Sequence, residues 1–312
     1  MDKDDNVRLQ PVSIDPLLPV EIATRLAAVG AKRASLSTRS LILLGLLGGL
    51  YIGLGGALAT LVLTDSALGY GLSRLVAGVA FSLGLIMLII AGGELFTGNN
   101  LMVLSLASRS ASASALMRNW GLVYLTNAAG AVLLAFAMYE SGVFDAGGPA
   151  ATAIKIAEAK AHLPPTSAFV RGALCNMLVC LAVWMSVSAR SLEGKVLAII
   201  FPISAFVALG FEHCIANFYL IPIGMLYGAN VSVVDLVHNL VAVTLGNMTG
   251  GAALAIVYWL VYLDGDQARL QGLTALISRW SERARPARKG QLCTAAARYA
   301  IAWLNVKKLS QR

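Results

Sequence analysis

Apolar residues dominate long stretches of this sequence, and windows of about 20 residues, the length of a bilayer-spanning helix, divide them into six segments. Two segments are much longer than one membrane crossing requires, which is typical of a span built from two half-helices and a connecting loop. The pattern predicts an all-α integral membrane protein with six transmembrane helices, the second and fifth broken, and both termini on one side. The expected spans cover residues 41–63, 74–107, 119–139, 168–189, 196–228 and 236–262.

A short motif of glycine, glutamate and asparagine interrupts both long segments near their middle. A charged side chain at the bilayer centre costs about 2.5 to 3.5 kcal/mol on insertion scales, so it is tolerated only where it faces protein or water. Paired breaks in the two halves of a membrane protein indicate a transport site. The motif comprises Gly92, Glu94 and Asn99 in the first segment and Gly210, Glu212 and Asn217 in the second, a constant separation of 118 residues.

A second repeat connects the third and sixth segments. Asn127 and Gly130 are matched by Asn247 and Gly250 at a separation of 120 residues. Because each half then contains three spans, an odd number, the second half enters the membrane from the opposite face. The sequence therefore predicts two inverted three-helix repeats.

Composition agrees with this class, since 58% of the 312 residues are hydrophobic and 13% are charged. The net charge of +8 is unevenly distributed: 20 of the 24 Lys and Arg residues lie in the first 40 residues, in the last 50 or in loops on the same side. This asymmetry predicts cytoplasmic termini and a multi-pass protein of the inner (cytoplasmic) membrane, not a nucleic-acid partner. The four exceptions are Arg74, Lys155, Lys160 and Arg171.

The sequence divides into a cytoplasmic N-terminal segment (1–40), a six-span transport domain (41–262) and a basic cytoplasmic tail (263–312). Asp15-Pro16 can start a helix, either a surface helix leading into the first span or a plug at the cytoplasmic mouth. The tail is either a helix on the cytoplasmic leaflet or disordered. No short apolar segment with a cleavage site opens the chain, so we expect no cleaved signal peptide.

The sequence gives no reason to expect a metal or a cofactor. Its four cysteines lack the paired spacing of metal ligands, and no Gly-Lys-Ser/Thr follows its glycine pairs, so ATP is not indicated. A membrane-embedded enzyme is the alternative class, but no nucleophile with a base, metal cluster or cofactor motif is present. We therefore expect a protein that is not an enzyme.

The longest connection between spans is an external loop from Glu140 to Ser167. Lys160 lies in it, shortly before Pro164-Pro165 and the fourth span. A lysine in a loop is ordinarily just solvated, but one held at the mouth of a transport site would raise the local concentration of anions.

Three motifs in order along residues 15–262 resemble those of the formate/nitrite transporter family, pentameric channel-like carriers of small monovalent anions. This resemblance implies a pore inside each of five identical subunits and an aquaporin-like shape. The tail beyond residue 265 is longer than expected for the family. The motifs are Ala91-Gly92-Gly93-Glu94-Leu95-Phe96-Thr97-Gly98-Asn99, Gly210-Phe211-Glu212-His213 with Ala216-Asn217 and Ile221-Pro222, and Leu245-Gly246-Asn247 with Gly250-Gly251.

The resemblance also implies roles for individual residues. It puts His213 at the pore centre, Thr97 on the loop that breaks the second span, and Lys160, Asn176 and Asn247 at polar lining positions. Apolar side chains form constrictions or line the pore beside them; these are Phe81, Leu85, Phe206, Leu95, Phe96 and Val179.

Taken together, these features predict transport of small monovalent anions, formate foremost, with nitrite or hydrosulfide as the alternative substrate. An anion drawn in by Lys160 could accept a proton from His213, whose unperturbed pKa is about 6.5; alternatively a charged His213 merely attracts the ion. Glu212 either orients the imidazole or holds the broken helix together. Asn176 and Asn247 would offer amide donors to the anion. A water or glycerol channel is disfavoured by the lysine and the histidine.

Overall fold

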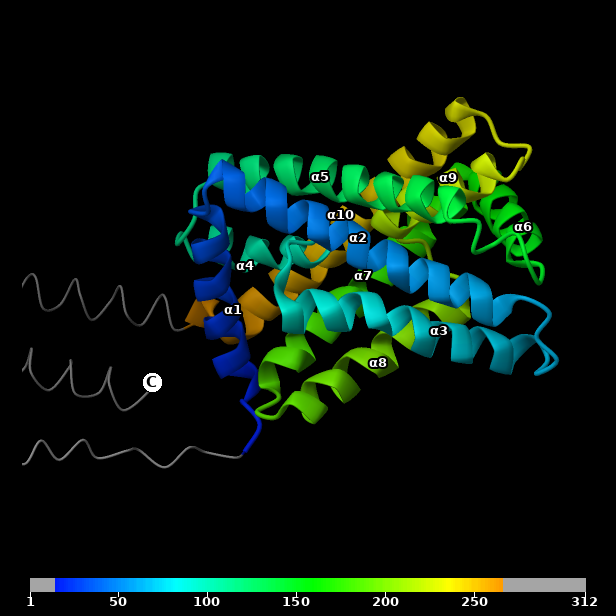
Figure 1. Cartoon of the computed structure of the whole chain (residues 1–312). Coiled ribbons are helices and arrows are strands. Elements are labelled where there is room, and N and C mark those ends of the chain that lie inside the picture. Colours follow the sequence, from blue (N-terminus) through cyan, green and yellow to red (C-terminus); the bar gives the residue numbers. More distant parts are fainter. Residues whose placement is uncertain (1–14, 266–312) are drawn as a thin grey trace, which may run out of the picture. The chain divides into compact units, whose positions relative to one another are not determined.

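The computed structural model describes residues 15–265, and those up to Leu263 form one compact helical unit without a strand. Six of its helices are long and apolar enough to cross a membrane, so the predicted all-helical, six-span fold is confirmed and the chain is a multi-pass membrane protein (Figure 1). The spans are α2 (Thr38–Leu63), α3 (Tyr70–Met87) with a π-helical turn (Leu88–Gly92), α5 (Ala113–Glu140), α7 (Pro165–Ser188), α8 (Leu192–Leu209) and α10 (Val233–Tyr262).

Four spans begin at a serine that the apolar pattern did not mark. In each case the serine hydroxyl accepts a hydrogen bond from the backbone N–H three residues later, which satisfies one of the free donors of the first turn. The helices therefore start a few residues before the apolar windows. The capping residues are Ser37, Ser112, Ser191 and Ser232.

The connection expected to be a loop between the third and fourth spans contains a helix, α6 (Pro149–Ala161). Gly148 precedes it with a φ of +92°, and Pro149 occupies the first turn, where its missing N–H costs nothing. A stripe of small side chains at helical spacing is buried, comprising Ala153, Ala157 and Ala161. The helix was missed because a stripe of alanines gives a weak amphipathic signal.

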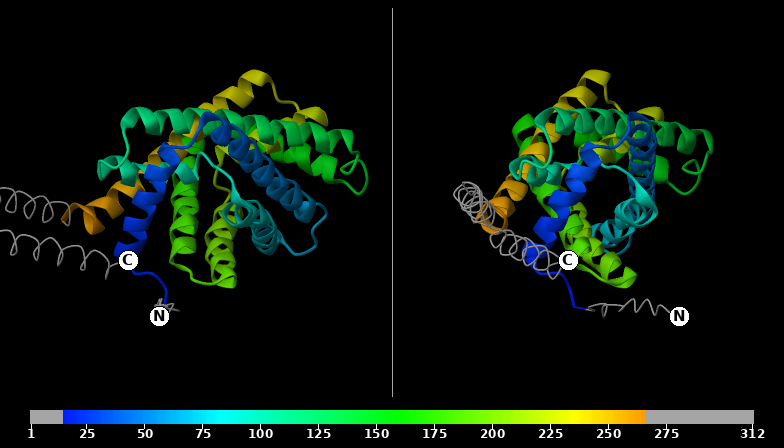
Figure 2. Two further views of the ribbon diagram at one scale, coloured as in Figure 1. Left: turned by 60° about the vertical axis from the view of Figure 1, so that its left-hand side comes forward. Right: turned by 90° about the vertical axis from the view of Figure 1, so that its left-hand side faces the viewer.

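Helix α1 (Pro19–Ala34) lies across the opposite end of the unit from α6, and both ends of the described chain lie at the α1 end (Figures 1 and 2). Its buried Ile22 and Leu26 belong to the same apolar cluster as Leu104 and Trp184. The Ser105 hydroxyl also donates to the carbonyl of Ala27 at 2.8 Å. Helix α1 is thus packed into this end of the protein and is more than a surface segment.

The two predicted breaks occur where glycine allows a left-handed backbone. Gly92 ends the second span with a φ of +96°, and Gly210 ends α8 with a φ of +72°. The chain resumes as a 3-10 turn (Gly98–Met102) and α4 (Val103–Ala107) in the first half, and as α9 (Cys214–Leu226) in the second. A side chain at either glycine would strain the backbone, which explains why both breaks carry the residue.

Close backbone contacts hold the spans around these breaks. A Cβ on Gly49 of α2 would collide with the carbonyl of Asn127 on α5, and one on Gly246 of α10 would collide with the carbonyl of Phe169 on α7. Small residues permit such approach in membranes, where lipid provides little hydrophobic drive for association. The glycine-rich first span therefore packs within the subunit, against the third.

Candidate functional site

A buried carboxylate holds the first break in place. The Nε of Arg33 lies 3.1 Å from Oε1 of Glu94. Asn99 donates from Nδ2 to Oε2 of Glu94 at 2.6 Å and to Oδ1 of Asn119 at 2.8 Å. Asn119 in turn donates to the carbonyl of Arg33 at 3.4 Å. The network ties α1, the loop of the second span and α5 together and gives the carboxylate a positive partner.

The same network recurs at the second break. The Nζ of Lys160 lies 2.9 Å from Oε1 of Glu212. Asn217 donates to Oε2 of Glu212 and to Oδ1 of Asn239, each at 2.8 Å, and Asn239 donates to the carbonyl of Lys160 at 2.8 Å. No hydrogen bond joins the Glu212 carboxylate to His213 within the described residues. Of the two roles left open for Glu212, the geometry matches that of holding the broken helix.

A further asparagine stabilises each break from the third span of the same half, Asn127 on α5 and Asn247 on α10. Each side chain donates twice and accepts once, and all three partners are backbone groups at or beside the break. Asn127 bonds the carbonyls of Gly45 and Glu94 and the N–H of Phe96; Asn247 bonds the carbonyls of Gly172 and Glu212 and the N–H of Cys214.

The amide of Asn176 is likewise committed to protein. Its Nδ2 lies 2.7 Å from the carbonyl of Asn247, 3.0 Å from Oδ1 of Asn100 and 3.3 Å from the carbonyl of Thr97. The expectation that Asn176 and Asn247 offer free amide donors to an anion therefore does not match the geometry. Both instead fix the loops that break the spans.

His213 joins the two halves at the centre. It is the N-cap of α9, and its Nδ1 accepts from the N–H of Ala216 at 3.1 Å. Its Nε2 lies 2.9 Å from Oγ1 of Thr97, on the loop of the other half. Because Nδ1 accepts, the proton of the neutral ring sits on Nε2 and points to Thr97. His213 is 3% exposed, so the imidazole is almost completely enclosed by protein.

Two phenylalanines lie beside this histidine. The rings of Phe81 and Phe206 are 5.4 Å apart and nearly perpendicular, and Phe206 stacks on His213 with centroids 6.1 Å apart. The predicted constriction residues Phe81 and Phe206 are thus brought together next to the central histidine, on helices α3 and α8.

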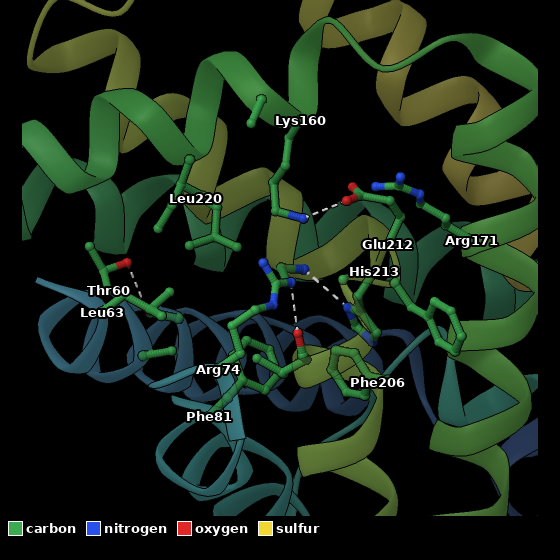
Figure 3. A pocket seen from close by; sticks show the side chains of 18 of the residues that line it. Thr60, Leu63, Arg74, Phe81, Lys160, Arg171, Phe206, Glu212, His213 and Leu220 are labelled. Carbon is green, nitrogen blue, oxygen red and sulfur yellow. Dashed lines mark hydrogen bonds and ion pairs between the residues drawn. The ribbon is translucent and has the colours of Figure 1, made fainter. Parts of the chain in front are cut away.

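A cavity of about 200 Å³ lies at the α6 end and leads to these three rings (Figure 3). Apolar side chains, including Leu63, Ile156 and Leu220, form much of its wall. Its charged or titratable lining residues are Arg74, Lys160, Arg171, Glu212 and His213.

The cavity contains only part of the predicted set. Lys160, Glu212, His213, Phe81 and Phe206 line it. The ring of Phe96 packs instead against Trp120 and Tyr124. The predicted pore and constriction residues that do not line the cavity are all buried; they are Leu85, Leu95, Phe96, Thr97, Asn176, Val179 and Asn247.

Two charged residues of the cavity lining were not predicted as site residues, Arg74 and Arg171. A signal for them was present in the sequence, because both are basic residues outside the positively charged side of the membrane. Among the described residues, no group of three or more His, Cys, Asp or Glu side chains gathers in a way that could hold a metal.

Comparisons with known proteins agree with this architecture. A sequence model described as "Formate/nitrite transporter" matches residues 20–261. A probable formate transporter of Methanothermobacter thermautotrophicus is 38% identical over 265 residues, which cover 78% of this chain and 97% of that protein. The formate channel FocA of Haemophilus influenzae is 37% identical over 271 residues, covering 80% and 94%. A solved structure described as a pentameric formate channel with formate bound is 40% identical, has a TM-score of 0.67, and is matched over 73% of this chain and 98% of its own.

Proposed function

Because this chain belongs to the formate/nitrite transporter family, we propose that it carries small monovalent anions across a membrane, with formate as its preferred substrate. Its relatives are channels and transporters, not enzymes. The observation that carries the proposal is the cavity at the α6 end, whose cationic side chains precede the apolar rings of Phe81 and Phe206 and the central His213. The choice of formate is supported by the named substrate of the relatives.

Nitrite and hydrosulfide are the alternative substrates of the same site. Both are small, monovalent and weakly basic, and the family description itself includes nitrite. Formate and nitrite are planar with two oxygens, whereas hydrosulfide presents one sulfur, so a comparison of the three distinguishes hydrogen-bonded recognition from simple charge attraction.

Proton coupling is the second step of the proposal. An anion cannot enter a dry apolar constriction cheaply, because the loss of its hydration costs tens of kcal/mol in an idealised low-dielectric medium. Protonation removes most of that barrier. His213 is the titratable group beside the constriction, and its Nε2 is shared with Thr97. We place proton transfer to the anion at Nε2 of the doubly protonated ring, which keeps its other proton on Nδ1 after the transfer.

The hydrogen bond that Nδ1 of His213 accepts as the N-cap of α9 determines when the ring can take up a second proton. A second proton on the ring would have to reside on Nδ1, which now accepts from the N–H of Ala216. The charged ring therefore loses one hydrogen bond, and an anion near Nε2 offsets that loss. In this scheme the histidine becomes charged when a substrate is present, which couples the proton to the anion.

Assembly and orientation complete the proposal. A homopentamer is supported by the relative described as pentameric. Cytoplasmic termini in the inner (cytoplasmic) membrane are supported by the concentration of Lys and Arg at the chain ends. The α6 end then faces outward and the α1 end faces the cytoplasm.

The decisive experiment is uptake of labelled formate into proteoliposomes with and without an inward proton gradient. We expect saturable uptake that the gradient stimulates. Absence of formate, nitrite and hydrosulfide flux in protein of confirmed fold would reject the transport function, whereas gradient-independent flux would reject only the coupling.

A further inference from the structure

Three cationic side chains from three helices meet in the cavity at the α6 end: Arg74 from α3, Lys160 from α6 and Arg171 from α7 (Figure 3). The cavity has one carboxylate, that of Glu212. The three cations differ in their protein partners. Two of them are bound by other groups of the fold, and one is free to bind a ligand.

Two of the three cations are committed to protein. Lys160 forms the ion pair with Glu212 at 2.9 Å, and its side chain is only 17% exposed. Arg74 donates from Nε to the carbonyl of Ala208 at 2.8 Å and from Nη2 to that of Val207 at 3.1 Å, at the carboxyl end of α8. Its guanidinium therefore caps the broken span, where the helix dipole favours a cation.

Arg171 is different. Within the described residues its side chain forms no hydrogen bond and no ion pair, although its backbone carbonyl accepts from the N–H of Glu212 at 3.3 Å. The residue is exposed and lines the cavity, and its guanidinium points toward Glu212 (Figure 3). An arginine with five unused donors at the rim of a partly apolar cavity is prepared to bind an anion.

The inverted repeat provides an internal comparison. The N–H of Glu94 donates to the carbonyl of Leu44 at 3.1 Å, in the same way that the N–H of Glu212 donates to that of Arg171. Leu44 is thus the counterpart of Arg171 in the half where Arg33 and Glu94 replace Lys160 and Glu212. The backbone position does not require arginine, so the positive charge at residue 171 is a property of the α6 end alone.

We propose that Arg171 is the anion-binding residue at the α6 mouth of the cavity and that it favours planar monoanions with two oxygens. This inference rests on the proposed transport of monovalent anions and identifies the group that first recognises them. A guanidinium presents two parallel N–H donors that match a carboxylate or nitrite, whereas an ammonium is a point charge. A cation at the rim of a low-dielectric cavity also concentrates anions from solution.

The test compares Arg171→Leu, which installs the residue of the other repeat, with Arg171→Lys. Lys155→Gln removes an exposed charge of α6 that does not line the cavity and serves as the control. Formate, nitrite and hydrosulfide influx are measured in proteoliposomes of each orientation, sorted by protease access to an amino-terminal tag. Circular dichroism and size-exclusion chromatography confirm that each variant is folded.

For entry from the α6 side at low ionic strength, we expect Arg171→Leu to raise the KM for formate about three- to tenfold, more than it changes the maximal flux. The effect shrinks to less than about twofold in 0.5 M salt, because the Debye length is then only a few ångströms. In Arg171→Lys we expect the KM for hydrosulfide to stay within about twofold of the wild-type value. The KM values for formate and nitrite should rise by a larger factor than this. Lys155→Gln changes none of these values appreciably.

Three results would overturn the inference while wild-type transport remains intact. These are an unchanged formate KM in Arg171→Leu, an equal change for entry from either side, and an equal change in Lys155→Gln. If wild-type protein transports none of the three anions, the proposed function itself is wrong.

Discussion

Tyr124 and Thr244 occupy equivalent positions in the two repeats, 120 residues apart, and their hydroxyl oxygens lie 3.0 Å from each other. A bond between equivalent residues requires that the axis relating the repeats pass near it. The ring of Tyr124 also packs on Phe96 of the first break and on Phe218 of α9, with centroids 4.9 and 5.5 Å apart. The two breaks therefore meet at this axis.

The two repeats differ in one chemically important residue. The counterpart of His213 at the separation of 118 residues is Leu95, a buried apolar side chain. One histidine thus serves both halves, and Thr97 from the opposite loop bonds it. One histidine in contact with both halves is suited to act on an ion arriving from either end.

The first prediction tests the proton role of this histidine. His213→Asn keeps an acceptor for the N–H of Ala216, since asparagine is a strong N-cap, but the amide cannot titrate. We expect the stimulation of formate uptake by an inward proton gradient to fall at least about tenfold, or to be replaced by an uncoupled anion current. Uptake into liposomes with and without the gradient measures it.

His162→Asn is the matched control, because His162 lies outside the cavity lining and its side chain is 51% exposed. It should leave gradient-driven uptake unchanged. Gradient-driven uptake that persists at the wild-type level in His213→Asn would remove His213 from the mechanism.

A second prediction concerns the apolar constriction. Phe206 contacts both Phe81 and His213, so Phe206→Ala widens the dry gap beside the histidine. We expect the flux of acetate relative to formate to rise several-fold, with a smaller rise for Leu85→Ala, because Leu85 is buried one turn below Phe81 and does not line the cavity. Paired measurements of acetate and formate flux give the ratio.

Phe201→Ala is the control for this series, since Phe201 lies on the same helix and is 70% exposed. It should not alter the flux ratio. If size discrimination is the same in all three variants, the constriction lies elsewhere.

The part of the site that could be predicted from the sequence is the part whose residues lie near one another along the chain. Gly92, Glu94 and Asn99 and their counterparts share one separation, so the motif was visible in the sequence. Arg33 and Lys160 are 127 residues apart, and Asn119 and Asn239 are 120 apart. These partners lie on other helices, and the distance along the sequence between each residue and its counterpart differs from that of the motif. Their pairing with the two glutamates is therefore visible only in the folded structure.

Two predicted roles differ from the structure because the hydrogen-bond partners of a buried side chain are not visible in the sequence. Asn176 and Asn247 were predicted as ligand donors because an amide in a membrane span needs a reason to be there. Their amide hydrogens instead bond other protein groups, namely the side chain of Asn100 and the carbonyls of Thr97, Gly172, Glu212 and Asn247. An interrupted helix leaves unpaired carbonyls and N–H groups in an apolar environment, and satisfying them is as strong a requirement as binding substrate. Sequence alone does not distinguish the two requirements.

A third prediction addresses the ion pair of Lys160 and Glu212. Glu212→Gln leaves the Lys160 ammonium largely buried without its counter-charge, a change that costs about 3 kcal/mol or more in comparable sites. We expect a clearly lower midpoint of thermal unfolding in detergent, with a smaller loss in the double variant Lys160→Met, Glu212→Gln. Glu193→Gln, at an exposed carboxylate in the first turn of α8, should lower the midpoint much less.

The corresponding change in the other half, Glu94→Gln, should destabilise in the same way, because Arg33 makes the equivalent pair at 3.1 Å. A double variant no more stable than Glu212→Gln alone would show that the unpaired ammonium is not the source of the loss.

The last prediction concerns the substrate. Formate, nitrite and hydrosulfide are monovalent, and one proton makes each of them neutral, whereas sulfate retains a charge after one protonation and still faces the desolvation cost of the constriction. We therefore expect proteoliposomes to pass formate and nitrite and to exclude sulfate, with formate favoured under an inward proton gradient. Fluxes of formate, nitrite, hydrosulfide, acetate and sulfate are ranked in one preparation. Sulfate flux comparable to that of formate would contradict the monovalent-anion function. Nitrite or hydrosulfide clearly ahead of formate would leave the fold and the site in place, and would transfer the physiological role to that anion.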